Sequence, residues 1–224
     1  SENKFKEAII EYKNVVQIDP KDPKAHYKLG LAHFRAMQFR EALSEFSKSV
    51  ELDQDVVDPR LQLGNLYLLA RKPDKAKEQA EKIIEKDPKN TSGLVLMSSV
   101  YAAQKDLEKA ISEAKKAIEI DPKRIEPYLH LANLYVLKKD FAQAEQTFKE
   151  AIKVDPNSVK ARYALGDLYR GTGKIDLALA EFIEATRITP KDPNAYINLG
   201  NLYVSLNQAA EAELQFIKSI EMDP

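Results

Sequence analysis

The chain has 224 residues, with 34 Lys and Arg residues against 35 Asp and Glu residues and no cysteine. A formal charge of -1 argues against a nucleic-acid-binding protein, which needs a strong basic excess. The missing thiols exclude disulfides, thiolate metal sites and a cysteine nucleophile. No apolar run approaches the ~18 residues of a membrane span, so we expect no direct membrane insertion. With 44% hydrophobic residues and few glycines, the composition favours a helical globular protein.

A short sequence pattern returns at a fixed interval. Ile18-Asp19-Pro20 recurs as Ile120-Asp121-Pro122 and as Val154-Asp155-Pro156, at separations that are multiples of 34. Alanine keeps this period at seven positions: Ala8, Ala42, Ala76, Ala110, Ala144, Ala178 and Ala212. Tyrosine keeps it at five: Tyr67, Tyr101, Tyr135, Tyr169 and Tyr203. The chain is therefore an array of equal modules without insertions.

The modules divide the chain from its first residue to its last. Residues 1–22 form a half module, with one helix expected from about Lys4 to Ile18. Full modules follow at 23–56, 57–90, 91–124, 125–158 and 159–192, and residues 193–224 form the sixth. Because Ser1 lies in the middle of a module, we expect the chain to be a piece of a longer protein. This leaves its compartment, cytoplasmic or bacterial periplasmic, undetermined.

Each full module predicts two helices and a short turn. In the module 125–158, apolar residues recur at helical spacing over 127–138 and again over 141–154. Pro127 suits the first turn of a helix, and Pro156 cannot continue one. A single pair cannot bury its apolar face alone, so we expect the modules to stack as a single solenoid over residues 1–224.

These modules, with their alanines, tyrosines and Asp-Pro linkers, resemble the tetratricopeptide repeat over the whole chain. The resemblance implies an all-α, right-handed superhelical α-solenoid of antiparallel helix pairs, here six pairs after the half repeat. The usual tryptophan of the first helix is replaced by His26, Arg60, Leu94, Tyr128, Arg162 and Tyr196. Ala80 and Ala114 stand where other modules have phenylalanine, which predicts thinner packing there.

Two features invite a different interpretation. Gly171-Thr172-Gly173-Lys174 is similar to part of a phosphate loop, but Leu168 stands in place of the required glycine, and the segment falls in a turn between helices. His26 and His33 are seven residues apart, ~10.5 Å along a helix, which is too far to bind one ion. We expect both histidines to serve packing. The sequence thus predicts no enzyme activity, no catalytic residue, no cofactor and no metal site.

We expect function on the first helices. The resemblance implies that they line a concave groove that binds a peptide or a partner helix, as a non-catalytic interaction scaffold. Helical phase predicts the groove residues Tyr27, Leu31, Phe34, Leu61, Asn65, Leu68, Val95, Leu129, Asn133, Val136, Tyr163, Asp167, Arg170, Ile197 and Asn201.

Two properties of this surface indicate a ligand. An apolar strip is expected at Leu61, Leu68, Leu69, Val95, Leu96, Leu129, Val136 and Leu137, unless neighbouring helices cover it. Asn65, Asn133 and Asn201 recur on alternate modules, and an amide can donate to and accept from a peptide backbone. Local solvation of the helices is the alternative explanation.

The expected partner is a protein or peptide, and not nucleic acid. The regular modules resemble those of long bacterial scaffold proteins. The alternative is the substrate-recruiting arm of a larger enzyme such as a glycosyltransferase. Because the array lacks a polar terminal helix, we expect either end-to-end self-association or a chain that continues at both ends.

Overall fold

The computed structural model describes residues 2–222, with side chains from Lys4 onward, and over this range the regular structure is thirteen helices without a strand. The lone helix α1 (Glu2–Ile18) begins two residues before its expected start. The first helices of the pairs are α2 (Pro23–Arg35), α4 (Val57–Leu69), α6 (Thr91–Ala103), α8 (Ile125–Leu137), α10 (Val159–Gly171) and α12 (Pro193–Ser205). The second helices are α3 (Phe39–Leu52), α5 (Pro73–Lys86), α7 (Leu107–Ile120), α9 (Phe141–Val154), α11 (Ile175–Ile188) and α13 (Ala209–Met222).

The helices keep the period of the sequence. Within each set, every helix begins 34 residues after the one before it. The expected all-α helical-repeat fold is confirmed. The chain divides after Asp121 into two compact units, the N-terminal unit (α1–α7) and the C-terminal unit (α8–α13). The sequence pattern, which is uninterrupted there, does not predict this division.

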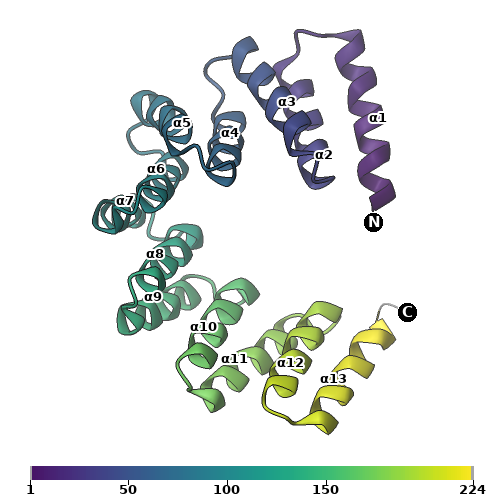
Figure 1. Ribbon diagram of the computed structural model, residues 1–224, viewed down its shortest axis with the longest axis vertical. Coiled ribbons are helices and arrows are strands. Elements are labelled where there is room, and N and C mark those ends of the chain that lie inside the picture. The colour runs from purple at the N-terminus through teal and green to yellow at the C-terminus, as the bar shows by residue number, and fades with distance from the viewer. Residues whose placement is uncertain (1, 223–224) are drawn as a thin grey trace. The chain divides into compact units, whose positions relative to one another are not determined.

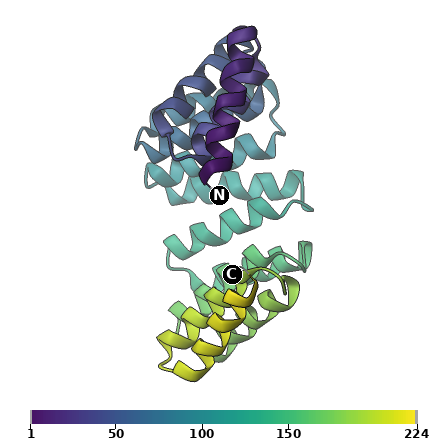
Figure 2. The same ribbon diagram turned by 90° about the vertical axis from the view of Figure 1, so that its right-hand side faces the viewer.

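Within a unit, each second helix that lies between two pairs packs on two first helices, its own and the next. In the C-terminal unit, α9 contacts α8 and α10, and α11 contacts α10 and α12. In the N-terminal unit, α3 and α5 do the same with α2, α4 and α6. Successive helices of a unit lie side by side and alternate in direction (Figures 1 and 2). The first helices therefore share one side of each unit, and the second helices share the other.

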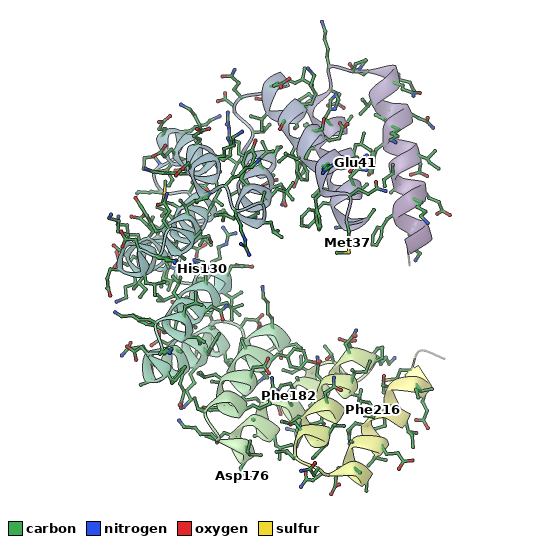
Figure 3. All side chains as sticks on the ribbon, viewed as in Figure 1. Met37, Glu41, His130, Asp176, Phe182 and Phe216 are labelled. Atoms are coloured by element: carbon green, nitrogen blue, oxygen red, sulfur yellow. The ribbon has the colours of Figure 1, made fainter. Side chains whose placement is uncertain are left out.

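Close approach within a pair depends on a glycine of the first helix. A Cβ atom at Gly166 would lie 2.7 Å from the ring of Phe182, and one at Gly200 would lie 2.6 Å from the ring of Phe216. Both rings lie between the helices of their pairs (Figure 3). Each ring thus fills the space that the absent side chain leaves, which is how these pairs reach close packing.

The pair α4 and α5 is packed in another way. Ala80 replaces the ring, and a Cβ atom at Gly64 would instead clash with Leu96, which comes from α6 of the next pair. Leu96 is 3% exposed and packs in one cluster with Ala80 and Ile83. The expectation that Leu96 belongs to an exposed strip is wrong, because this side chain occupies the space that a phenylalanine fills elsewhere.

Substitution of Gly166 tests the contact between glycine and ring. Gly166→Ala should destabilise the protein by about 1–3 kcal/mol, because the new methyl group overlaps the Phe182 ring. Gly171→Ala is the matched control on the same helix, since a Cβ atom there meets nothing within 4 Å. Urea unfolding measures both. Equal stability of the two variants would contradict the packing account.

The turn inside each pair contains one residue with left-handed backbone. These residues are Met37, Arg71, Lys105, Lys139, Gly173 and Asn207, with φ from 56° to 75°. In the first of these turns, the N–H of Gln38 donates to the carbonyl of His33 at 2.9 Å, which closes the end of α2. Gly173 occupies this position between α10 and α11, so the Gly-Thr-Gly-Lys segment is a turn, as the sequence predicts.

Arg71 offers a test of this turn. Its left-handed φ of 56° is costly for any residue with a Cβ atom, so Arg71→Gly should stabilise the protein by about 1 kcal/mol. Ala70→Gly, one residue earlier at a φ of -78°, should destabilise it by about 0.5–1 kcal/mol. Thermal unfolding of the two variants should therefore move in opposite directions. A loss of stability in Arg71→Gly would refute the interpretation.

The position usually held by tryptophan carries a side chain with a polar end in every first helix except α6, which has Leu94. His26 Nε2 lies 3.1 Å from the carbonyl oxygen of Pro20, and its Nδ1 lies 2.6 Å from Glu45 on α3. The same bond to the carbonyl six residues earlier is made by Arg60, Tyr128, Arg162 and Tyr196. His26 is 6% exposed, so its expected packing role is confirmed. Its hydrogen bonds also join the linker to both helices of the pair.

Candidate functional site

In the N-terminal unit, most predicted groove residues are partly buried against the core. Tyr27, Leu31 and Phe34 pack, partly buried, against the cluster around Phe46. Leu61 and Leu68 pack against the cluster that contains Leu96. Val95 is also partly buried, and Asn65 is the one predicted residue of this unit that is exposed. Neighbouring helices thus cover most of the apolar strip here, which was the alternative that the sequence left open, but Leu69 is 67% exposed.

In the C-terminal unit, the predicted residues are more accessible. The exposed ones are Asn133, Asp167, Arg170, Ile197 and Asn201. Val136 and Tyr163 are partly buried. Leu129 is only 6% exposed, so its expected place on an open wall is wrong. Removal of apolar surface from water favours burial between packed helices, and both Leu129 and Leu96 are buried in this way.

Two cavities open between the first helices of the C-terminal unit. The cavity between α8 and α10 has a volume of about 350 Å³ and is lined by Asn133, Val136, Phe141, Phe148, Ala164, Asp167, Leu168, Gly171 and Thr172. The cavity between α10 and α12 has a volume of about 330 Å³ and is lined by Tyr163, Asp167, Arg170, Phe182, Asn198, Asn201 and Leu202. Asp167 lines both, so the two cavities adjoin. Six predicted residues lie here: Asn133, Val136, Tyr163, Asp167, Arg170 and Asn201.

The two cavities are the same site in consecutive modules. Shifting the first lining by 34 residues gives every residue of the second except Tyr163: Asn133 becomes Asp167, Val136 becomes Arg170, Phe148 becomes Phe182, Ala164 becomes Asn198, Asp167 becomes Asn201 and Leu168 becomes Leu202. The phenylalanine lies on the second helix in both cases. The exchanges of Val136 for Arg170 and of Ala164 for Asn198 make one cavity apolar and the other hydrogen-bonding. We call them the apolar pocket and the polar pocket.

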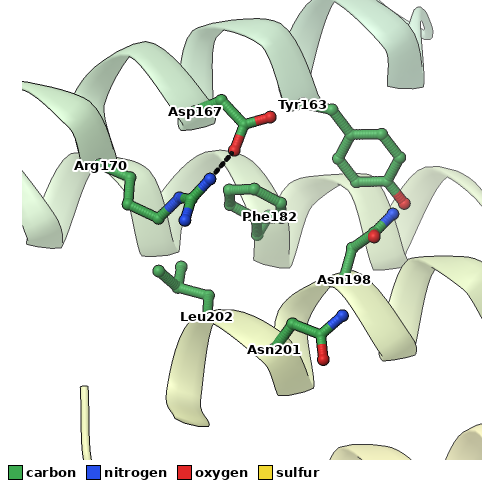
Figure 4. A pocket seen from close by; sticks show the side chains of 7 residues that line it. All are labelled: Tyr163, Asp167, Arg170, Phe182, Asn198, Asn201 and Leu202. Carbon is green, nitrogen blue, oxygen red and sulfur yellow. Dashed lines mark hydrogen bonds and ion pairs between the residues drawn. The ribbon is translucent and has the colours of Figure 1, made fainter. Parts of the chain in front are cut away.

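The polar pocket contains an ion pair, between Arg170 and Asp167, and the buried hydroxyl of Tyr163. Arg170 Nη2 donates to Asp167 Oδ1 at 2.9 Å (Figure 4). The Tyr163 hydroxyl is buried and, among the described residues, makes no hydrogen bond of good geometry. Burial raises the pKa of Tyr163, and the amide of Asn198, which lies beside the hydroxyl, opposes that rise. Tyr163 is therefore protonated near neutral pH and can donate to a ligand.

The sequence missed part of this lining. Asn198 and Ala164 follow directly after the predicted residues Ile197 and Tyr163, yet neither was included. Ile197 was predicted, but it is not among the residues that line either pocket. The surface between two first helices takes adjacent positions from one of them, which the phase of a single helix does not reveal. The repeat of Ala164 and Asn198 at 34 residues was the available signal.

Glu145 of α9 is the most strongly perturbed carboxylate. The ammonium groups of Lys149 and Lys174, each at 2.7 Å, and the hydroxyl of Tyr169, at 3.1 Å, bind its carboxylate. They lower the pKa of Glu145 from 4.5 to about 2. The contacts connect α9 with α10 and with the turn before α11.

This cluster predicts a pH dependence. A lowered carboxyl pKa stabilises the folded state above the unfolded value of 4.5, and the contribution is lost as the pH falls toward 2. Glu145→Gln should therefore reduce the slope of the unfolding free energy against pH in this range. Glu213→Gln, an exposed position on α13, should leave the slope unchanged. An unaltered slope in Glu145→Gln would contradict the role of the cluster.

The histidines and acidic residues form no metal site in residues 2–222, where no three potential ligands gather. His26 makes the contacts described above, and His33 Nδ1 lies 2.6 Å from Gln38 Oε1. Burial lowers the pKa of His130 to about 4, so this imidazole is neutral near pH 7.

Over residues 2–222, every helix is too short or too polar to cross a bilayer.

The terminal helices carry exposed apolar side chains. On α13, Leu214, Ile217 and Ile220 are 46–65% exposed, and on α1, Ile10 and Ile18 are 60% and 86% exposed. These residues fit either of the two expectations for the ends of the array. Self-association through them stays a prediction.

An all-α array of helix pairs with ligand-sized pockets between its first helices defines a helical-repeat interaction protein. Family models described as TPR repeat or tetratricopeptide repeat match residues 1–36 and 166–207, 61–125, 101–165 and 193–224. The chain belongs to the tetratricopeptide repeat family. A fold of this family generally serves as a protein–protein interaction scaffold without catalysis and binds protein or peptide partners.

Solved structures agree on the fold. A thermophilic TPR protein of Thermus thermophilus is 22% identical, with a TM-score of 0.71 over 81% of this chain and 99% of its own. A tetratricopeptide repeat protein from Parabacteroides merdae is 19% identical, with a TM-score of 0.69 over 99% of this chain and 88% of its own. The APC/C hetero-tetramer Cut9–Hcn1 includes a chain that is 14% identical, with a TM-score of 0.70 over 100% of this chain and 44% of its own. No curated protein matches in sequence.

Proposed function

We propose that the first-helix surface of the C-terminal unit, formed by α8, α10 and α12, binds an extended segment of a partner protein and catalyses no reaction. The observation that carries this proposal is the pair of adjoining pockets, of about 350 and 330 Å³, on the helices that the sequence marks for binding. Each is large enough for a side chain, and each is open at the surface. A chain that crosses both would bury side chains in succession.

Amide groups at the pockets favour an extended ligand. Asn133, Asn198 and Asn201 line them, and a side-chain amide can donate to a carbonyl and accept from an N–H. An extended backbone leaves these groups free, whereas a helix uses them internally. The polar residues of the surface therefore suit an extended segment better than a partner helix.

The chemistry of the pockets supports binding rather than catalysis. Arg170 is held by Asp167, and the raised pKa of Tyr163 removes it from proton transfer near neutral pH. The structural relative in the Cut9–Hcn1 hetero-tetramer works within an assembly. These observations together support a scaffold that recruits another chain.

The test is selection of peptides from a phage-displayed random library on the purified protein, followed by fluorescence polarisation with a selected peptide. The double variant Asn133→Ala, Asn201→Ala should bind it about thirtyfold more weakly, for a loss of about 1 kcal/mol per amide. Asn157→Ala, at an exposed position in the linker before α10, should bind like the wild type. Undiminished binding by the double variant would overturn the proposal.

A further inference from the structure

We infer that the segment bound at this surface is a polyproline II stretch with an apolar side chain and an uncharged hydrogen-bonding side chain three residues apart. The inference rests on the proposed function and specifies its ligand. It follows from the chemistry of each pocket and from the width of the helix α10 that lies between them.

The apolar pocket selects a hydrocarbon side chain. Val136, Ala164 and Phe148 line it without a hydrogen-bonding group. Asn133 and Asp167 also line it, but the first serves the ligand backbone in the proposed function and the second is paired with Arg170 at 2.9 Å. The Thr172 hydroxyl at its edge already donates to the carbonyl of Leu168 at 2.8 Å. A polar ligand side chain placed against Val136, Ala164 and Phe148 would lose its water without compensation. Leucine, isoleucine or methionine would instead gain about 1.5–3 kcal/mol on full burial.

The polar pocket selects a neutral side chain. Its two charges, Arg170 and Asp167, lie 2.9 Å apart and compensate each other. A ligand carboxylate would face Asp167, and a ligand ammonium group would face Arg170. A glutamine or asparagine amide, in contrast, can accept from the buried Tyr163 hydroxyl and donate to an amide or carboxylate oxygen of the lining. It would supply the partner that this hydroxyl lacks.

The spacing of the pockets sets the conformation. They lie on the two sides of α10, and a helix with its side chains is ~10–12 Å wide. Both linings include Asp167 of α10, so the two pockets adjoin at this helix. In a polyproline II helix, residues i and i+3 share a face and lie ~9.3 Å apart. A β-strand places same-face residues ~6.6 or ~13 Å apart, below and above the width of the helix.

The first arm of the experiment varies the ligand. Proline-rich peptides carry leucine and glutamine three residues apart or two apart, and fluorescence polarisation measures their dissociation constants. Peptides with the three-residue spacing should bind about tenfold more tightly than those with the two-residue spacing, because the shorter spacing leaves one pocket empty. Replacing the glutamine by glutamate, lysine or leucine should also weaken binding about tenfold. Equal affinity across these peptides would overturn the inference.

The second arm exchanges the pocket chemistry. The variant Arg170→Val, Asn198→Ala gives the polar pocket the residues that the apolar pocket holds at Val136 and Ala164. Its preference should change from the leucine–glutamine peptide to a leucine–leucine peptide. The control Arg187→Val, Asn157→Ala, outside both pockets, should keep the original preference. Thermal unfolding verifies that both variants are folded.

The outcomes separate the two proposals. Binding that depends on Asn133 and Asn201 but shows no preference for spacing or side chain would refute this inference and leave the proposed function in place. Binding that is independent of both asparagines would refute the proposed function, and this inference with it. If the Arg170→Val, Asn198→Ala variant still prefers the leucine–glutamine peptide, the polar pocket does not select the glutamine side chain, and this inference is refuted.

Discussion

The contact between a small residue of the first helix and a ring of the second is the interaction on which the other features depend. At Gly166 and Phe182 it brings the helices of a pair so close that even a methyl group would not fit. The same ring then forms part of the lining of the polar pocket. Phe182 thus both packs between the helices of its pair and would contact a ligand side chain. The stability of the array and the shape of its binding surface therefore have a common origin.

Strict periodicity turns this contact into a set of equivalent pockets. Because the helices begin at intervals of 34 residues, the two spaces between first helices of the C-terminal unit have corresponding linings, and the character of each depends on a few positions. The change from Val136 to Arg170 and from Ala164 to Asn198 alters the chemistry without touching the ring beneath. Selectivity can therefore vary along the array while the core stays the same, which is an advantage that repeat architectures offer.

The sequence predicted the helices, the turns and the role of His26 because these depend on local pattern. The period, the position of proline and the spacing of apolar residues indicate where a helix starts and stops. Burial was harder to predict, because it depends on the size of neighbours from other modules. Leu96 is buried since Ala80 leaves space beside Gly64, a relation among three different helices. Asn198 was missed for a similar reason, since a pocket between two helices does not follow the phase of either one alone.

The most direct test of the account is NMR observation of side-chain amides during titration with a proline-rich peptide that carries leucine and glutamine three residues apart. We expect saturable shifts in the signals of Asn133, Asn198 and Asn201, on the first helices, and none in those of Asn157. Shifts confined to Gln143 and Gln146, on the second helix α9, would contradict the account, because binding would then occur on the opposite side of the unit.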